Sequence, residues 1–333
     1  MYIIHFNYHT PSYMPFSKVF DTGLHADCVR FVPTELDREI AVFSCYELEE
    51  TTGKRLGKLI LAENTTEKEE VRVIEEVTDI PGVFEFTWFK GGSNLLVTAL
   101  ATGPPRLFKY NGANLVPVEI QSAGFDDLEM TLAVAGEPEC FVTCDNKGNL
   151  QQWNLNNATL EMNQEWNGHD AEIWYVSQDK HNSNLFYSGS DDYSMKCWDV
   201  RCASSAAQLV AANKSGHEAG VCCVVSSPWD EYTLASGSYD GKVRLWDRRA
   251  FRGDPIKSIE CGSGAWRVAW NPQKSNEIAI AAMRAGFHVI DLAENGILRT
   301  ESVDDHVAYG IDWHPNGRSV ASCSFYNSQG QFF

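Results

Sequence analysis

The chain has 333 residues and carries 45 acidic against 27 basic side chains, for a net charge of −18. Hydrophobic residues make up 44% and charged residues 22%, which is ordinary for a folded protein and excludes a largely disordered chain. The acidic balance argues against a nucleic-acid-binding surface, because such surfaces need clustered Lys and Arg. It favours a basic partner, or else it simply keeps the protein soluble.

Ten cysteines are scattered through apolar runs without a CxxC pair, so we expect reduced core residues and no metal site. Cys140 and Cys144 lie four residues apart, but no second Cys or His pair at zinc-site spacing accompanies them. The N-terminal stretch lacks a basic segment followed by a continuous apolar one, and no run of about 18 apolar residues occurs. We therefore expect a cytoplasmic monomer that contacts neither membrane nor nucleic acid.

Seven short apolar strands, each ending in proline or a polar turn, are predicted along the chain. Polar stretches at 49–58 and 63–70 are predicted to be loops in the first unit. Turn signals such as GG, NG, DG and NKG separate the alternating apolar segments, as an all-β chain requires. Five of these strand segments are 26–33, 83–90, 128–134, 265–272 and 308–315. The other two fall between 128–134 and 265–272, one before each of the two WD motifs described next.

Two of these units form a clear repeat. The stretch SGSDDYSMKCWDVR at 188–201 aligns with SGSYDGKVRLWDRR at 236–249, a shift of 48 residues. In both, a histidine precedes the WD tryptophan by 29 residues. A period of roughly 40 to 50 residues, with GH at one end and WD at the other, is typical of a four-stranded WD40 blade. We therefore predict that residues 1–333 form one domain, an all-β, seven-bladed WD40 β-propeller.

Serine, histidine and aspartate stand near the tryptophan in both strong repeats, which raises the question of a hydrolytic triad. A triad needs to occur once, whereas this set recurs at the repeat period. The duplication predicts a structural relay, in which aspartate holds the turn and the histidine, and serine passes the hydrogen bond to the buried indole. The relay residues are His169, Ser188, Asp192 and Trp198 in one repeat, and His217, Ser236, Asp240 and Trp246 in the next.

The chain ends in SFYNSQGQFF, which supplies only the inner strands of the seventh blade. An N-terminal segment, either 2–8 or 17–22, is expected to add the missing outer strand, which closes the ring and removes exposed sheet edges. Asn327 stands where an aspartate is expected, and Phe333 where a tryptophan is expected. Both departures reduce the expected rigidity of this blade.

No GxSxG, HExxH, P-loop or dinucleotide fingerprint is present, so any chemistry has to be assembled from loops. In a propeller, the residues that open each innermost strand ring the mouth of the central channel. Aromatic rings and carboxylates there can hold a quaternary ammonium or grip a peptide, or the tryptophans can simply pack between blades. The expected ring comprises Asp27, Phe84, Glu172, Trp174, Cys222, Trp266, Arg267, Tyr309 and His306.

Several strings go beyond a generic WD repeat. They are FDTGLHADCVRFVP, GVCCVVSSP, GAWRVAWNP, and AYGIDWHP followed by ASCSFYN. In this order and spacing, together with the two WD repeats, they resemble the WD-repeat diphthine methylesterase family of the diphthamide pathway. The resemblance covers the first blade and most of residues 165–327.

The resemblance implies hydrolysis of the methyl ester on methylated diphthine, a modified histidine of the translocating translation elongation factor. The product is the carboxylate that a later ligase amidates to diphthamide. The substrate carries a trimethylammonium group, which suits substrate binding by Glu172, Trp174 and Trp266. A strongly acidic chain also suits a basic, RNA-binding partner protein. No cofactor is implied.

Ester hydrolysis needs a nucleophile or an activated water, and a donor to the oxyanion. Asp27 or His306 is a candidate to orient water or to activate Cys222. Packing or surface exposure is an alternative explanation for Cys222 and for His306. Arg267 or Tyr309 is the candidate oxyanion donor.

Two other classes of function stay open at this point. A non-catalytic WD40 scaffold would recruit pathway enzymes to the elongation factor and would release no methanol by itself. A reader of methylated lysine or arginine also uses an aromatic cage at a propeller mouth, and would bind methylated peptide without turnover.

Overall fold

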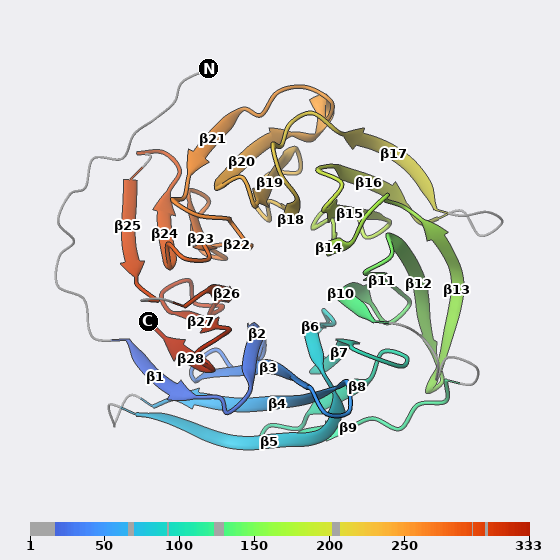
Figure 1. The fold of residues 1–333 in the computed structure, drawn as a ribbon, viewed down its shortest axis with the longest axis vertical. Helices are drawn as coiled ribbons and strands as arrows, with labels where there is room; N and C mark the ends of the chain where they lie inside the picture. Colours follow the sequence, from blue (N-terminus) through green and yellow to red (C-terminus); the bar gives the residue numbers. More distant parts are fainter. Residues whose placement is uncertain are drawn as a thin grey trace.

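The computed structural model describes residues 17–65, 70–91, 93–122, 130–201, 207–294, 296–303 and 306–333. These residues form seven antiparallel sheets of four strands each, arranged as blades around a central channel (Figure 1). The predicted seven-bladed, all-β propeller is confirmed. Within the described ranges, no helix is long and apolar enough to span a membrane.

Each blade has an innermost, a second, a third and an outer strand. The innermost strands are β2 (His25–Phe31), β6 (Val83–Trp88), β10 (Thr131–Glu137), β14 (Ile173–Gln178), β18 (Val221–Ser226), β22 (Arg267–Trp270) and β26 (Ala308–Trp313). The second strands are β3 (Glu39–Glu49), β7 (Leu95–Leu100), β11 (Cys140–Asp145), β15 (Leu185–Ser190), β19 (Thr233–Ser238), β23 (Glu277–Ala281) and β27 (Val320–Ser324).

The third and outer strands complete the blades. The third strands are β4 (Lys54–Asn64), β8 (Leu107–Tyr110), β12 (Asn149–Asn156), β16 (Met195–Asp199), β20 (Lys242–Asp247), β24 (Phe287–Asp291) and β28 (Gln329–Phe332). The outer strands are β5 (Val71–Pro81), β9 (Leu115–Pro117), β13 (Thr159–Asn167), β17 (Gln208–Asn213), β21 (Lys257–Glu260), β25 (Gly296–Glu301) and β1 (Lys18–Asp21). A 3-10 turn, Arg248–Ala250, follows β20.

The apolar segments found in the sequence are the innermost strands. These strands are buried on both faces because each packs between neighbouring blades, so they read as near-continuous apolar runs; five of the six residues of β18, VCCVVS, are fully buried. The predicted segment 128–134 corresponds to β10, with residues 128 and 129 outside the described part of the chain. The nine cysteines within the described ranges are free thiols, eight of them buried, and Cys202 lies outside those ranges.

The ring closes through β1, which pairs antiparallel with β28 to complete the seventh blade (Figure 1). Lys18 lies opposite Phe332, so of the two predicted closing segments it is 17–22 that supplies the strand. The other segment, 2–8, lies outside the described residues. Phe20 packs edge-on against Phe43 of the first blade at 5.0 Å, while Val19 points outward and is 47% exposed.

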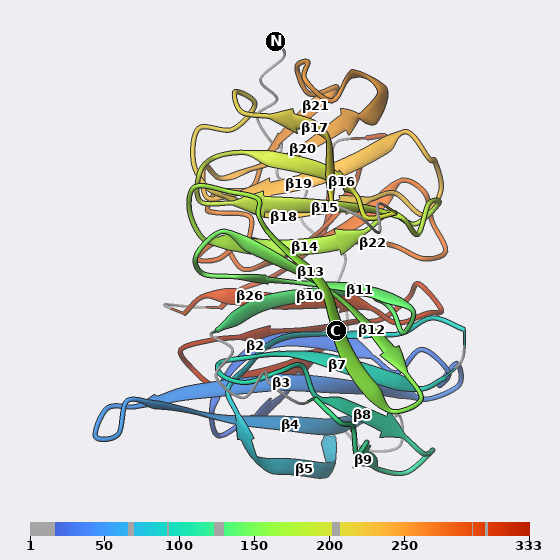
Figure 2. The same ribbon diagram turned by 90° about the vertical axis from the view of Figure 1, so that its right-hand side faces the viewer.

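The first blade carries a long hairpin in place of a predicted loop. The stretch 49–58 consists of the end of β3, a short turn and the start of β4, with Glu49 opposite Lys54. The loop prediction was wrong because exposed strands at a hairpin tip carry charged side chains, which read as loop. Figure 2 shows this hairpin reaching past the rest of the body. It does so at the channel end where the innermost strands begin, since His25 opens β2 and pairs with Tyr46 of β3.

We expect Phe20→Ala to lower the free energy of unfolding by about 2 kcal/mol, because it removes the aromatic contact that holds the closing strand. Val19→Ala, one residue away on the exposed face of the same strand, should change it by less than about 0.5 kcal/mol. Urea unfolding of both variants measures this. Equal effects of the two substitutions would contradict the assigned closure.

Candidate active site at the channel mouth

The first relay forms as the sequence predicts. Trp198 donates its indole N–H to Ser188 Oγ at 2.9 Å, and Ser188 Oγ lies 2.7 Å from His169 Nε2. His169 Nδ1 in turn lies 2.9 Å from Asp192 Oδ2. Burial lowers the pKa of His169, against the opposing effect of Asp192, so the imidazole is neutral at physiological pH. A neutral ring that accepts from serine and donates to aspartate satisfies every member of this buried chain.

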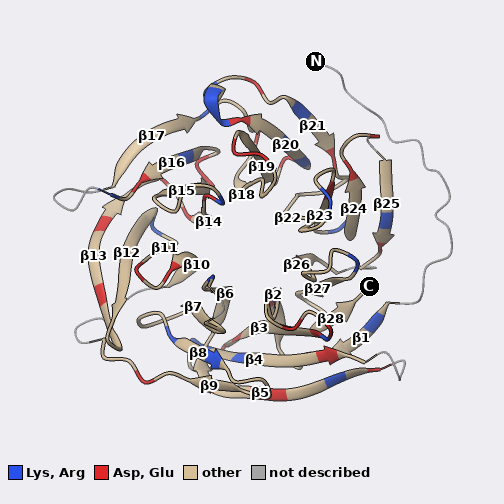
Figure 3. Ribbon diagram, turned by 180° about the vertical axis from the view of Figure 1, so that it is seen from behind, with Lys and Arg blue, Asp and Glu red and all other residues tan. Residues whose placement is uncertain are grey.

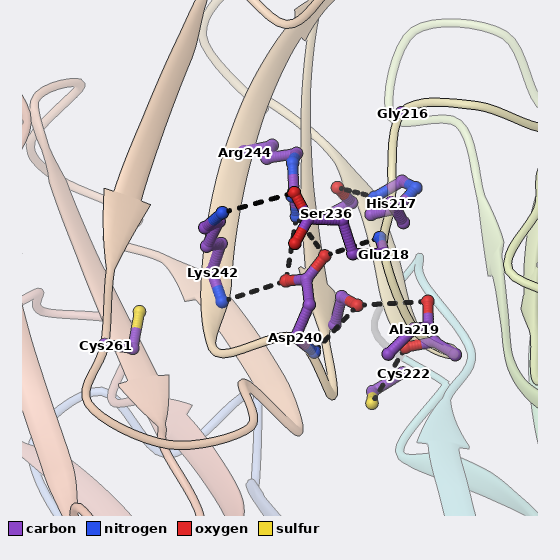
Figure 4. A network of polar contacts seen from close by, with 12 residues as sticks. Gly216, His217, Glu218, Ala219, Cys222, Ser236, Asp240, Lys242, Arg244 and Cys261 are labelled. Atoms are coloured by element: carbon purple, nitrogen blue, oxygen red, sulfur yellow. Dashed lines mark hydrogen bonds and ion pairs between the residues drawn. The ribbon is translucent and has the colours of Figure 1, made fainter. Parts of the chain in front are cut away.

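The second relay keeps the serine link but not the aspartate link. Trp246 and His217 both lie 2.8 Å from Ser236 Oγ. Asp240 bonds instead to Arg244 at 2.9 Å, as Figure 4 shows, and His217 Nδ1 has no partner in the described part of the chain. The prediction that aspartate holds the histidine is therefore wrong in this blade.

The cause is the cation on the third strand. The second repeat has Arg244 where the first has Lys196. The guanidinium of Arg244 lies 3.0 and 2.9 Å from the two oxygens of Asp240, whereas Lys196 bonds the carbonyl of Gly168 and approaches Asp192 only to 3.9 Å. Burial, with the nearby Arg244, lowers the pKa of His217 to about 3. Both relays thus hold neutral imidazoles inside the blades, away from the channel.

A cavity of about 520 Å³ occupies the end of the channel where the innermost strands begin. Five of its lining residues come from the β3–β4 hairpin of the first blade: Tyr46, Glu47, Leu48, Glu50 and Arg55. Six residues of the ring expected from the sequence also line it: Asp27, Phe84, Trp174, Trp266, Arg267 and Tyr309.

Six aromatic side chains line this cavity, and five consecutive pairs of them are in direct contact. Trp174 contacts Trp266 with ring centroids 5.6 Å apart, and Trp266 contacts Tyr309 at 4.9 Å. Tyr309 stacks on Phe325 at 4.9 Å, and Phe325 meets Tyr46 of the first blade at 5.1 Å. Neither Tyr46 nor Phe325 was singled out by the sequence, because both lie beyond the openings of the innermost strands, although Phe325 stands in the discriminating string ASCSFYN.

The series returns to its start through the second blade. Tyr46 contacts Phe84 at 4.5 Å, and Phe84 shares an apolar cluster with Leu132, against which Trp174 packs. We call the six residues Tyr46, Phe84, Trp174, Trp266, Tyr309 and Phe325 the aromatic ring. Electron-rich faces around a pocket of this size suit an organic cation, which aromatic rings attract without a counter-charge at each contact.

Asp27 is the buried carboxyl group of this cavity. It is 5% exposed, and its Oδ1 receives no hydrogen bond from any described residue. Burial raises the pKa of Asp27 well above the ordinary value, although the guanidinium of Arg267 opposes the shift. A cation or a water molecule placed beside a carboxylate buried in this way stabilises its ionised form.

Arg267 is held in place by a carboxylate that the sequence reading overlooked. Its Nε donates to Glu85 Oε2 at 3.2 Å, and its Nη1 donates to the carbonyls of Cys222 and Trp266 at 3.1 and 3.0 Å. Nη2 donates to no group in the described ranges, and the guanidinium lies over the rings of Tyr175 and Trp266, with 4.7 and 4.6 Å from Cζ to the ring centroids. Glu85 also binds Arg30 at 3.1 Å, and as the charged residue of the otherwise apolar strand VFEFTW it was detectable.

Tyr309 offers a second donor at the cavity wall. Its hydroxyl makes no hydrogen bond to the described residues, and burial raises the pKa of Tyr309, so the hydroxyl stays protonated. The mouth therefore combines a buried acceptor, Asp27, with two donor groups that bond no described residue.

Three residues of the expected ring do not line the cavity. Cys222 is fully buried with its thiol directed at the carbonyl of Gly220 (Figure 4), and burial raises the pKa of Cys222 well above its ordinary value, which disfavours a thiolate. Glu172 precedes β14 and is half-buried on the rim. His306 lies in the loop before β26, where its backbone N–H bonds Val303.

Residues 160–199 and 210–247 match the family model described as WD domain, G-beta repeat. The chain is a WD-repeat β-propeller. It is 28% identical over 336 residues to "Diphthine methyltransferase" of Mus musculus, a match that covers 89% of this chain and 69% of that protein. It is 24% identical to "Diphthine methyltransferase homolog" of Dictyostelium discoideum and 25% identical to "Diphthine methyltransferase" of Schizosaccharomyces pombe. These matches cover 91% and 92% of this chain and 94% of each relative.

The geometry predicts that the relays act on stability alone. Ser188→Ala and Ser236→Ala each strand a buried indole N–H and a ring nitrogen, so each should lower the free energy of unfolding by about 1 to 3 kcal/mol. Ligand binding at the mouth should persist in both variants at a temperature where they remain folded. Denaturant titrations and a binding assay measure the two effects; selective loss of binding in one variant would restore the triad interpretation.

Proposed function

We propose that this protein hydrolyses the methyl ester of methylated diphthine on a translation elongation factor. The observation that carries the proposal is the buried carboxyl group of Asp27, which lines the same cavity as the six residues of the aromatic ring and the two donors, Arg267 and Tyr309. The relatives whose names contain diphthine align with about nine-tenths of the chain, which supports a diphthine-bearing protein as the substrate.

Substrate binding follows from the chemistry of the modified side chain. Its trimethylammonium group carries a charge with no N–H to donate, so aromatic faces bind it better than any hydrogen-bonding pocket. The faces of Trp174 and Trp266 supply that surface, and the carboxylate of Asp27 supplies the opposite charge. Placing the cation beside Asp27 also favours the ionised carboxylate, which burial alone disfavours.

Hydrolysis then needs only a water molecule and the three groups at the mouth. Ionised Asp27 takes a proton from water as the oxygen attacks the ester carbonyl, and the tetrahedral oxyanion is stabilised by Arg267 and Tyr309. Collapse expels methoxide, which takes the proton from Asp27, so the products are methanol and the carboxylic acid of diphthine, which then releases its proton to water and becomes the carboxylate. Cys222 takes no part in this route, because its thiol is buried and does not line the cavity.

A second candidate is methyl transfer onto diphthine, which the names of the relatives favour. Transfer adds a methyl group from a donor, whereas hydrolysis removes one and releases methanol. The purified protein, incubated with methylated elongation factor and no methyl donor, distinguishes the two. We expect methanol release and loss of one methyl group by mass spectrometry. Methylation of an unmethylated factor that depends on an added donor would replace the proposal with the transferase.

A scaffold or a reader is distinguished by the same incubation. Either would bind the factor, but neither would release methanol. Absence of turnover with intact binding would therefore overturn the hydrolase.

Asp27→Asn removes the proton acceptor, and we expect it to lower kcat/KM for ester hydrolysis by at least about 100-fold. The fold should survive. Because burial raises the folded-state pKa of Asp27, ionisation destabilises the native protein as pH rises from the unfolded-state pKa through the folded-state pKa, and Asn should raise stability at neutral pH. Thermal denaturation at neutral and acidic pH measures the stability change, which should vanish at acidic pH. Full activity of this variant would exclude Asp27 as the base.

The acidic limb of the wild-type rate profile provides an independent check. A base works only when ionised, so kcat/KM should fall on acidification at a pH well above the usual aspartate value of about 3.9. Burial is the main cause of the raised pKa of Asp27; of the charged groups that face it, Arg267 opposes the shift and Glu85 adds to it.

A further inference from the structure

We propose that the rim beside Trp174 is the surface that docks the substrate protein, and that it fits a protein face rich in lysine and arginine. We call it the docking rim and define it by Tyr193, Tyr239, Asp170, Glu172 and Asp191. The inference rests on the proposed function, which supplies a protein substrate whose modified side chain has to enter the neighbouring mouth.

Tyr193 is a tyrosine at a turn position whose backbone conformation favours glycine. It lies in the turn between β15 and β16 with φ 66°, a left-handed conformation that bulky residues rarely adopt. The next repeat has Gly241 at the equivalent position with φ 82°. Glycine takes this conformation freely, so tyrosine here is a costlier choice for the same turn. The side chain is 50% exposed and thus gains little packing in return. Strain of this kind at an exposed aromatic points to a contact outside the chain.

Three carboxylates around Tyr193 have no cationic partner. Asp170, Glu172 and Asp191 form no ion pair with the described residues. Neighbouring acids differ in this respect: Asp192 lies 3.9 Å from the ammonium group of Lys196, and Glu218 lies 3.6 Å from that of Lys242. Unpaired carboxylates beside an exposed tyrosine complement lysine and arginine on a partner.

The docking rim is continuous with the aromatic ring. Asp191 Oδ1 accepts the indole N–H of Trp174 at 3.4 Å, which links the turn of Tyr193 to the cavity wall. Tyr239, 37% exposed, contacts Trp174 and Trp266 with centroids 6.2 and 5.8 Å apart. On the far side of the mouth Tyr326 is 62% exposed and contacts His25 at 5.9 Å. Exposed tyrosines therefore flank the opening through which the modified residue enters.

The residue types on the docking rim indicate the chemistry of the partner. Exposed tyrosines are frequent anchors of protein interfaces, because they bury a large rigid surface and keep a polar tip. Acidic residues are also spread over other parts of the blades, including β5 and β13 (Figure 3), so the net charge alone does not single out a face. What singles out this rim is the combination of a strained exposed tyrosine, unpaired carboxylates and direct contact with the mouth.

The test substitutes Tyr193→Asn and, separately, the pair Asp170→Asn and Glu172→Gln. Asparagine tolerates the left-handed backbone, so the fold should be at least as stable as the wild type. The matched control is Ile256→Asn, since Ile256 is 65% exposed in the loop after β20, at the opposite end of the channel. Binding of the methylated elongation factor and binding of tetramethylammonium are measured for each variant by calorimetry.

We expect Tyr193→Asn to weaken binding of the elongation factor about tenfold or more, with tetramethylammonium affinity unchanged. The acidic pair should weaken factor binding and reduce its dependence on salt, while the control changes neither. Unchanged factor binding in both rim variants would overturn the docking rim, and so would parallel loss of tetramethylammonium binding, because the effect would then lie in the mouth. Methanol release is scored separately, so failure of hydrolysis with rim-dependent binding would refute only the catalytic proposal.

Discussion

The pairing of β1 with β28 is the constraint on which the mouth depends, because it joins the two ends of the described chain in one blade. Closure places the seventh blade against the first, so that Phe325 meets Tyr46 and completes the aromatic ring. The inner strand β26 then lies beside β2, and Tyr309 comes to stand at the same mouth as Asp27. An open ring would leave sheet edges unpaired and the aromatic ring interrupted at this junction.

Two opposed electrostatic effects set the character of the mouth. Burial disfavours the charge on Asp27, and Arg267 favours it; since the pKa is raised, burial wins. Arg267 contributes less than its proximity suggests, because Glu85 already neutralises it from the other side at 3.2 Å. The carboxylate of Glu85 bridges Arg267 to Arg30 and so fixes the guanidinium where it reaches the cavity. The result is a site in which an incoming organic cation would stabilise charge on Asp27.

Much of the architecture followed from local pattern. The register of the two WD repeats located the relay serines and the innermost strands, because burial on both faces leaves an unbroken apolar run that is visible in the sequence. Counting from those strands placed Asp27, Trp266 and Arg267 at one channel end. The same counting misplaced Cys222, since adjacent residues of a strand point to opposite faces and a one-residue difference decides between channel and core. It also missed the hairpin at 49–58, whose charged tip resembles a loop.

The sequence by itself therefore determined the blade, the closure by an N-terminal strand and the channel end at which six of the predicted residues gather, because each depends on periodicity and on which residues open a strand. Only the tertiary structure decided which side chains share the cavity. Tyr46 and Phe325 enter the ring through contacts between the first and last blades, and Asp240 turns to Arg244 instead of His217 through competition between neighbouring strands. Such choices depend on distances between residues far apart in the chain, and no local pattern encodes them.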